Sequence, residues 1–173
     1  MATLRRPSDH EAIEYYRTYI QKVGGNDFVQ TLQQSLAKNL AKLQSLSEAQ
    51  WNYKYEADKW TVKEVLVHLL DTERIFAYRA LRIARNDKTP LPGFDQNDFV
   101  PNSEAQGRSI PSLLEEYELV RRANIALFKN MSDAMLNRMG TASNGGFSVL
   151  ALGYMIAGHE IHHWELFADR YGI

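Results

Sequence analysis

The stretch WTVKEVLVHLLD, residues 60–71, contains the clearest helix start in the chain. Thr61 and Glu64 are spaced as a capping box, in which each side chain satisfies a backbone N–H of the first turn. Trp60 before the cap and Val65 after the first turn are placed to pack together as a hydrophobic staple. Apolar residues then recur at helical spacing to about residue 85, which predicts one long amphipathic helix.

Helical spacing also continues on both sides of this stretch. A capping box at Ser8 predicts a short N-terminal helix over about 8–23, which the glycine pair after it would end. Apolar residues at helical spacing predict a second helix from about Asp27 to 47. Further helices are predicted from Pro111 to about 130 and over about 147–171.

Residues 87–110 contain three of the five prolines and form one long connection between predicted helices. Loops of this length are uncommon in compact domains and are often functional. Four long helices joined by one long crossover predict an all-α four-helix bundle. We expect a single domain over 1–173, with the bundle at about 27–171 after the short N-terminal helix.

The composition is typical of a globular protein, with 45% apolar and 24% charged residues. The formal net charge is −1 and there is no basic block, so we expect no nucleic-acid partner. The chain has no cysteine, which excludes disulfides, thiolate metal sites and a cysteine nucleophile. It has no apolar run of about 18 residues and no secretory signal, so we expect a cytoplasmic protein without a membrane partner.

Three of the five histidines lie in the stretch GHEIHHWE, residues 158–165. His159 and His163 are four residues apart and share one face of a helix, so both imidazoles can reach one ion. His159 and His162, three residues apart, are a second possible pair. Helical phase does not distinguish these two choices, because both lie in largely apolar rows.

His68, within the long helix after Thr61, is a third histidine at an inward position. A single histidine there is more often a hydrogen-bonded core residue than a ligand. Together with a histidine pair on another apolar helix, it completes a three-imidazole set with an open fourth position, a catalytic type of metal site. The alternative is that the histidines are core residues without an ion, which requires polar partners for three buried imidazoles.

The string H-E-x-x-H at residues 159–163 is also the helical zinc motif of many metalloproteases. A protease of this kind needs a third ligand further along the chain, but only ten residues follow His163. Leu166 and Asp169 occupy the positions where the extended motif has glycine and histidine. Glu165 lies roughly 200° around the helix from His163, so it cannot bind the same ion. The geometry therefore excludes a protease.

Four other residues are candidates for supporting roles near these histidines. Asp71 lies one turn after His68. It either orients an imidazole or is a solvated carboxylate. Arg79 either binds an anionic cosubstrate or pairs with a helix carboxylate. Glu160 is a possible base, although a position at the surface or behind a ligand suits it better. His162 is either a donor in the pocket or only a neighbour. The loop 91–95 either covers the open end of the bundle or is a packed crossover.

Three segments together resemble the DinB-like superfamily and its YfiT-like branch. WTVKEVLVHLLD matches the superfamily signature W-[ST]-x-x-[EQ]-x-x-x-H-L-x-D. ERIFAYRALRIARNDKTPLPGFDQNDF, residues 73–99, and GHEIHHWELFADRYG, residues 158–172, resemble the YfiT-like branch. The resemblance runs in the same order along the chain, from about residue 27 to 171.

The resemblance implies an up-down-down-up bundle with its long crossover between the second and third helices. It also implies one divalent ion per chain, Zn²⁺ or Ni²⁺, held by His68, His159 and His163, and so selects His163 over His162. Family members commonly form dimers, and some are transferases that use low-molecular-weight thiols. We therefore expect a homodimeric metal-dependent transferase that adds such a thiol to an electrophilic small molecule. The alternatives are a metal-dependent hydrolase that uses water, and a non-catalytic metal- or ligand-binding stress protein.

Overall fold

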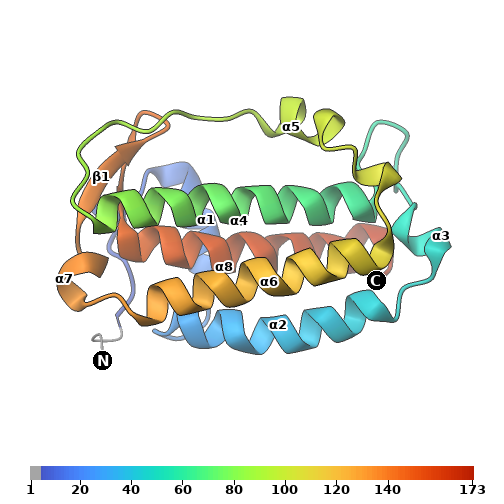
Figure 1. Cartoon of the computed structure of the whole chain (residues 1–173), viewed down its shortest axis with the longest axis horizontal. Helices are drawn as coiled ribbons and strands as arrows, with labels where there is room; N and C mark the ends of the chain where they lie inside the picture. Colours follow the sequence, from blue (N-terminus) through green and yellow to red (C-terminus); the bar gives the residue numbers. More distant parts are fainter. Residues whose placement is uncertain (1–4) are drawn as a thin grey trace.

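The computed structural model describes residues 5–173 and contains the predicted bundle. Its four long helices are α2 (Phe28–Gln44), α4 (Val62–Ala84), α6 (Ile110–Lys129) and α8 (Val149–Leu166). α4 and α6 run in the direction opposite to α2 and α8, and the crossover between them passes along one side of the bundle (Figure 1). The up-down-down-up topology is therefore confirmed. Between residues 5 and 173, no helix has both the length and the hydropathy needed to cross a bilayer.

Each long helix begins at a side chain that caps its free N–H groups. Asp27, Ser109 and Ser148 accept hydrogen bonds from the first turns of α2, α6 and α8. At the start of α4, the amide of Glu64 donates to Thr61 Oγ1 at 3.2 Å, and the Glu64 carboxylate accepts from the Thr61 amide at 2.7 Å. These bonds fix the helix starts to the residues that the sequence pattern indicates.

The predicted N-terminal helix over 8–23 is divided in the structure. The capping box at Ser8 opens only the 3₁₀ turn η1 (Asp9–Glu11), and α1 (Glu14–Lys22) begins after two extended residues. The buried Glu11 carboxylate accepts hydrogen bonds from Arg5 and from the Ser8 amide, which holds the turn in place. Ala12 is buried in the core in an extended conformation, so the helix cannot continue through it.

Short elements fill the connections that the sequence pattern left irregular. They are α3 (Glu48–Trp51), α5 (Gln96–Asn102), η2 (Ala105–Gly107), α7 (Asp133–Leu136), β1 (Met139–Ala142), β2 (Gly145–Ser148) and the π-helical turn η3 (Phe167–Tyr171). The antiparallel strands β1 and β2 pair Met139 with Ser148 and Ala142 with Gly145. Ser143 and Asn144 form the two-residue turn between them, and both have positive φ, as a type I′ hairpin requires.

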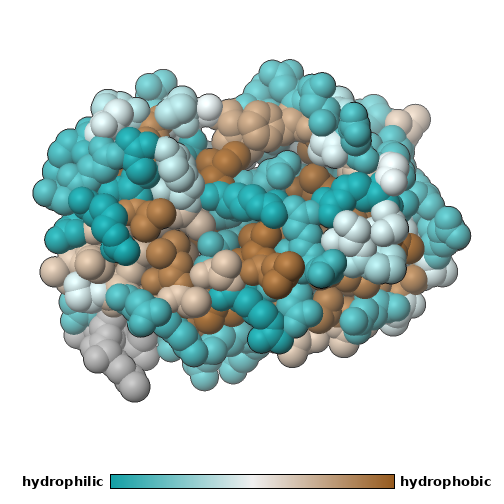
Figure 2. Space-filling model, in the orientation of Figure 1, coloured by the Kyte–Doolittle hydropathy of each residue, from teal (hydrophilic) through white to brown (hydrophobic). Residues whose placement is uncertain are grey.

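The buried side chains form two apolar clusters, one toward each end of the bundle. Between them lies a polar layer of buried residues: His68, Thr72, Glu73, Arg121, Asn124, His159, Glu160 and His163. The outer face drawn in Figure 2 intersperses hydrophobic patches with hydrophilic residues, as expected where each helix buries only one side. The polar layer thus occupies the position where bundles commonly build metal and ligand sites.

Candidate metal centre

Three imidazoles meet in the polar layer, one from α4 and two from α8. Nε2 of His159 lies 3.1 Å from Nε2 of His68 and 3.2 Å from Nε2 of His163. One nitrogen from each ring lies within 4.8 Å of the others. The three residues are only 3%, 6% and 8% exposed, in chain order. The one-turn spacing on α8 and the antiparallel packing of α4 against it produce this arrangement.

The contacts at His159 are suited to a cation rather than to hydrogen bonding alone. An imidazole nitrogen carries either one proton or one lone pair, so His159 Nε2 can make a good hydrogen bond with only one of its two neighbours. The other contact then either shares the same proton or lone pair, as a weak hydrogen bond, or sets two protons or two lone pairs against each other. A cation between the three nitrogens removes this conflict, since each ring then offers its lone pair.

The three imidazoles are held in the uncharged form that binds metals. Burial, together with a smaller effect of the nearby His162, lowers the pKa of His68 to about 4. Burial and the neighbouring imidazoles place the pKa values of His159 and His163 well below the ordinary value. All three rings are therefore neutral near pH 7, as metal ligation requires.

Aromatic rings enclose the cluster and set the orientation of the imidazoles. Trp60 lies 5.1 Å from the ring of His68, and Tyr19 lies edge-on to His159 at 5.2 Å, both measured between centroids. His163 Nδ1 is buried, and no described residue offers it a hydrogen bond. Packing, rather than a hydrogen bond from behind, therefore positions this ring.

His162 lies beside the cluster but contributes no nitrogen to it. Its ring packs at 5.2 Å against His163 and at 5.5 Å against Tyr19. The structure brings His159 and His163, rather than His162, together with His68 on the α8 face toward α4. His162 is a neighbour whose half-buried ring supports the enclosure.

Glu160 points away from the three imidazoles into a buried ion network. Its carboxylate accepts hydrogen bonds from Arg121 Nη1 and Nη2 at 2.9 Å each and from the Tyr117 hydroxyl at 2.6 Å. Arg121 also binds Glu73, with its Nε 2.9 Å from Oε1. Burial disfavours the charged form of Glu160, but Arg121 outweighs this and keeps the pKa of Glu160 lowered.

This network corrects one expectation and was otherwise missed. Glu160 is 2% exposed and bound on both carboxylate oxygens, so it is neither a surface residue nor a base directed at the cluster. Arg121 and Glu73 were not among the predicted site residues. Both are charged residues at inward-facing positions of apolar helices, and this sequence feature could have identified them.

Within the described residues, neither of the two remaining candidates, Asp71 and Arg79, forms a hydrogen bond with an imidazole. Burial raises the pKa of the half-buried Asp71, and the charged side chains acting on it are Arg74, Glu116 and Arg108. Among the described residues, no hydrogen bond connects Asp71 to a histidine, so its predicted role behind a ligand has no support here.

Arg79 is buried, and in the described part of the chain it does not pair with a helix carboxylate, which was one of its two predicted roles. Its Nη2 donates to the Pro92 carbonyl at 2.7 Å and to Ser143 Oγ at 2.9 Å. Its guanidinium also lies 6.0 Å from the centre of the Phe94 ring. Arg79 therefore anchors the crossover loop to the bundle, which makes this loop both packed and a cover for the site.

Two cavities border the cluster, one at His159 and the other at His163. The tyrosine chamber, of about 260 Å³, is lined by Tyr15, Tyr16, Tyr19, Thr72, Phe76, Phe94, Asp95, Gln96, Asn97 and His159. The tryptophan chamber, of about 370 Å³, is lined by Tyr55, Asp58, Lys59, Trp60, Val65, Asn97, His163, Leu166 and Tyr171. Asn97 of α5 lines both, so the crossover helix lies between the two approaches.

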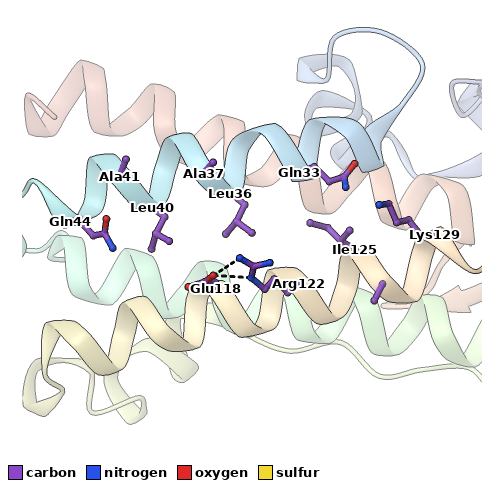
Figure 3. A pocket seen from close by; sticks show the side chains of 11 residues that line it. Gln33, Leu36, Ala37, Leu40, Ala41, Gln44, Glu118, Arg122, Ile125 and Lys129 are labelled. Carbon is purple, nitrogen blue, oxygen red and sulfur yellow. Dashed lines mark hydrogen bonds and ion pairs between the residues drawn. The ribbon is translucent and has the colours of Figure 1, made fainter.

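A further groove, of about 700 Å³, lies between α2 and α6. Leu36, Leu40 and Ile125 point into it, and Glu118 pairs with Arg122 at its edge (Figure 3). None of its lining residues belongs to the histidine cluster. Histidines of the candidate metal centre do line the two chambers.

The family model of the DinB superfamily matches residues 31–167, and this chain belongs to that superfamily. A protein of Oceanobacillus iheyensis, provisionally named a metal-dependent hydrolase, is 20% identical over 156 residues, which cover 89% of this chain and 80% of that protein. The solved structure of YfiT from Bacillus subtilis aligns with a TM-score of 0.66 at 16% identity. The alignment covers 95% of this chain and 93% of YfiT, which is described as a probable metal-dependent hydrolase with an unusual four-helix bundle topology.

Proposed function

We propose that this DinB-superfamily protein holds one Zn²⁺ or Ni²⁺ ion with His68, His159 and His163 and adds a low-molecular-weight thiol to a small electrophile. The observation that carries the proposal is the meeting of three neutral, buried Nε2 atoms between two chambers. When bound, the ion would supply Lewis-acid chemistry that lowers the pKa of the incoming nucleophile.

The buried acidic residues of the polar layer are not free to act as bases. The buried carboxylates of the polar layer, Glu73 and Glu160, are both engaged by Arg121. A nucleophile that ionises readily therefore suits the site better than one that depends on a protein base. In the addition, sulfur forms a bond to the electrophilic carbon, and the thiol proton passes to the atom that receives the displaced electron pair.

The presence of two chambers favours a reaction between two molecules. The tyrosine chamber borders His159 and the tryptophan chamber borders His163. A thiol entering from one side and an electrophile entering from the other would meet at the imidazole cluster. Homodimerisation, which the family resemblance implies, also remains part of the proposal.

Hydrolysis is the second candidate function, with water taking the place of the thiol. The names given to the Oceanobacillus protein and to YfiT both favour it. It requires the same three histidines, so the two functions differ in the nucleophile and not in the site.

Turnover with and without a thiol distinguishes these candidates. Untagged zinc-loaded and nickel-loaded protein would be mixed with an epoxide, an unsaturated ketone, an aryl halide and an ester, each with and without cysteine or bacillithiol. Thiol-dependent product that disappears in His68→Ala but persists in His10→Ala supports the transferase. His10 is a matched control because it is an exposed histidine remote from the cluster in sequence. Turnover of the ester without thiol supports the hydrolase, and metal binding without any turnover contradicts both.

A further inference from the structure

Thr72 carries an unpartnered hydroxyl in the middle of α4. The residue is 3% exposed, and its Oγ1 has no hydrogen-bond partner in the described part of the chain. A threonine inside a helix ordinarily bonds back to the carbonyl one turn earlier, and Thr72 does not. Since a buried hydroxyl without a partner is unfavourable, its presence calls for a ligand that completes it.

Thr72 belongs to the wall of the tyrosine chamber, beside the candidate metal centre. Thr72 lies one turn after His68 and one turn before Phe76, and it lines the same cavity as His159. The volume of about 260 Å³ is below the 300–1,000 Å³ that is typical of pockets for drug-sized ligands. The chamber therefore suits a small molecule that reaches Thr72 and the cluster together.

The other lining residues define the chemistry of that molecule. Tyr15, Tyr16, Tyr19, Phe76 and Phe94 supply aromatic walls, which favour a planar ring. No lysine or arginine is among the lining residues, all of which lie in the described range. The single formally charged lining group is a carboxylate, that of Asp95, which offsets part of the positive charge that an ion at His159 would add, so no lining side chain calls for an anionic ligand.

We propose that the tyrosine chamber binds a small uncharged aromatic carbonyl compound whose oxygen accepts a hydrogen bond from Thr72 Oγ1. The aromatic ring then lies against the tyrosine and phenylalanine side chains, and the carbonyl group lies toward His159. This assignment rests on the proposed function in that the compound is the electrophile of the addition. Thr72 is then a specificity-determining residue, because it selects ligands with an oxygen acceptor at this point.

Binding of acetophenone, compared with ethylbenzene, tests this assignment without any turnover. The two probes have similar shapes, but only acetophenone has a carbonyl oxygen. Titrations of zinc-loaded wild type, Thr72→Val and Thr72→Ser would be followed by NMR. We expect Thr72→Val to weaken acetophenone binding about 3- to 10-fold, the ratio that corresponds to one net hydrogen bond. Thr72→Ser should restore it to within about twofold of wild type, and ethylbenzene should bind the three proteins alike.

The outcomes separate this inference from the proposed function. Equal acetophenone affinity in wild type and Thr72→Val, or equal losses for acetophenone and ethylbenzene, overturns the role of Thr72. Failure of acetophenone to bind a protein that consumes thiol overturns the chamber assignment alone. Thr72-dependent acetophenone binding without thiol consumption supports the chamber assignment and removes the transferase. Circular dichroism and zinc content of each variant confirm that the fold and the centre are intact.

Discussion

Replacing Gly158 with alanine tests how closely α1 must approach α8. A methyl group at Gly158 would lie 1.9 Å from the carbonyl oxygen of Tyr19. Ordinary contact begins at about 3.4 Å, so the two backbones would have to separate by 3.4 − 1.9, or about 1.5 Å. The obstructing atom belongs to the backbone and cannot rotate away as a side chain would.

Two opposing effects determine how much Gly158→Ala changes the free energy of unfolding. Alanine favours a helix interior over glycine by about 1 kcal/mol. Overpacking costs about 1–3 kcal/mol, and a required displacement of 1.5 Å in the backbone places this site at the upper end. We therefore expect Gly158→Ala to lower the free energy of unfolding by about 2 kcal/mol, measured by urea denaturation with circular dichroism.

A control glycine outside the contact has the opposite expectation. A methyl group at Gly24 would meet no atom within 4 Å, so Gly24→Ala should be neutral or stabilising by about 0.4–1 kcal/mol. If Gly158→Ala is as stable as wild type or more stable, the inference that α1 must pack this closely against α8 is wrong. The same displacement moves Tyr19, so Gly158→Ala should also weaken acetophenone binding in the tyrosine chamber.

Three further predictions concern charge and capping. Arg121→Met leaves two buried carboxylates without their cation and should destabilise the fold by about 3–5 kcal/mol in urea denaturation; a loss below 1 kcal/mol would contradict the buried network. Burial raises the pKa of Glu11, but Arg5 and Ser8 outweigh it and lower this pKa to about 2. The difference in the free energy of unfolding between wild type and Glu11→Gln should thus be largest at pH 7 and should vanish as the pH falls from 4.5 toward 2. A difference that does not depend on pH would refute the stabilising role of the Glu11 carboxylate. Thr61→Ala removes the cap of α4 and should lower the melting temperature, at a cost of about 1 kcal/mol, whereas an unchanged melting temperature would show that the cap is dispensable.

The sequence was sufficient for the four long helices because each has local signals. The capping box at Thr61 and the apolar spacing after it depend only on residues within a few turns. The candidate histidines were also recognisable: spacing on α8 allowed either His162 or His163 beside His159, and the family resemblance selected His163. The structure adds the convergence of their Nε2 atoms, which depends on how α4 packs against α8.

Features made by tertiary contacts were not predictable in this way. The 3₁₀ turn at Asp9 replaces helix because Arg5 holds Glu11 and the core holds Ala12. Neither contact can be recognised from the pattern of neighbouring residues. The hairpin around Asn144 contains turn-forming residues. Its strands of four residues are too short to show the alternation of apolar and polar residues that indicates a strand. The unpartnered hydroxyl of Thr72 becomes visible only when every possible neighbour is in place.

Metal content per chain tests the central claim most directly. Untagged wild type, His68→Ala, His159→Ala, His163→Ala and the control His10→Ala would be exposed to zinc or nickel, dialysed and measured by elemental mass spectrometry. We predict about one ion per chain in wild type and His10→Ala, and loss of the ion in each of the other three variants. A wild type that retains no ion, or cluster variants that retain it like the control, would contradict the three-histidine centre.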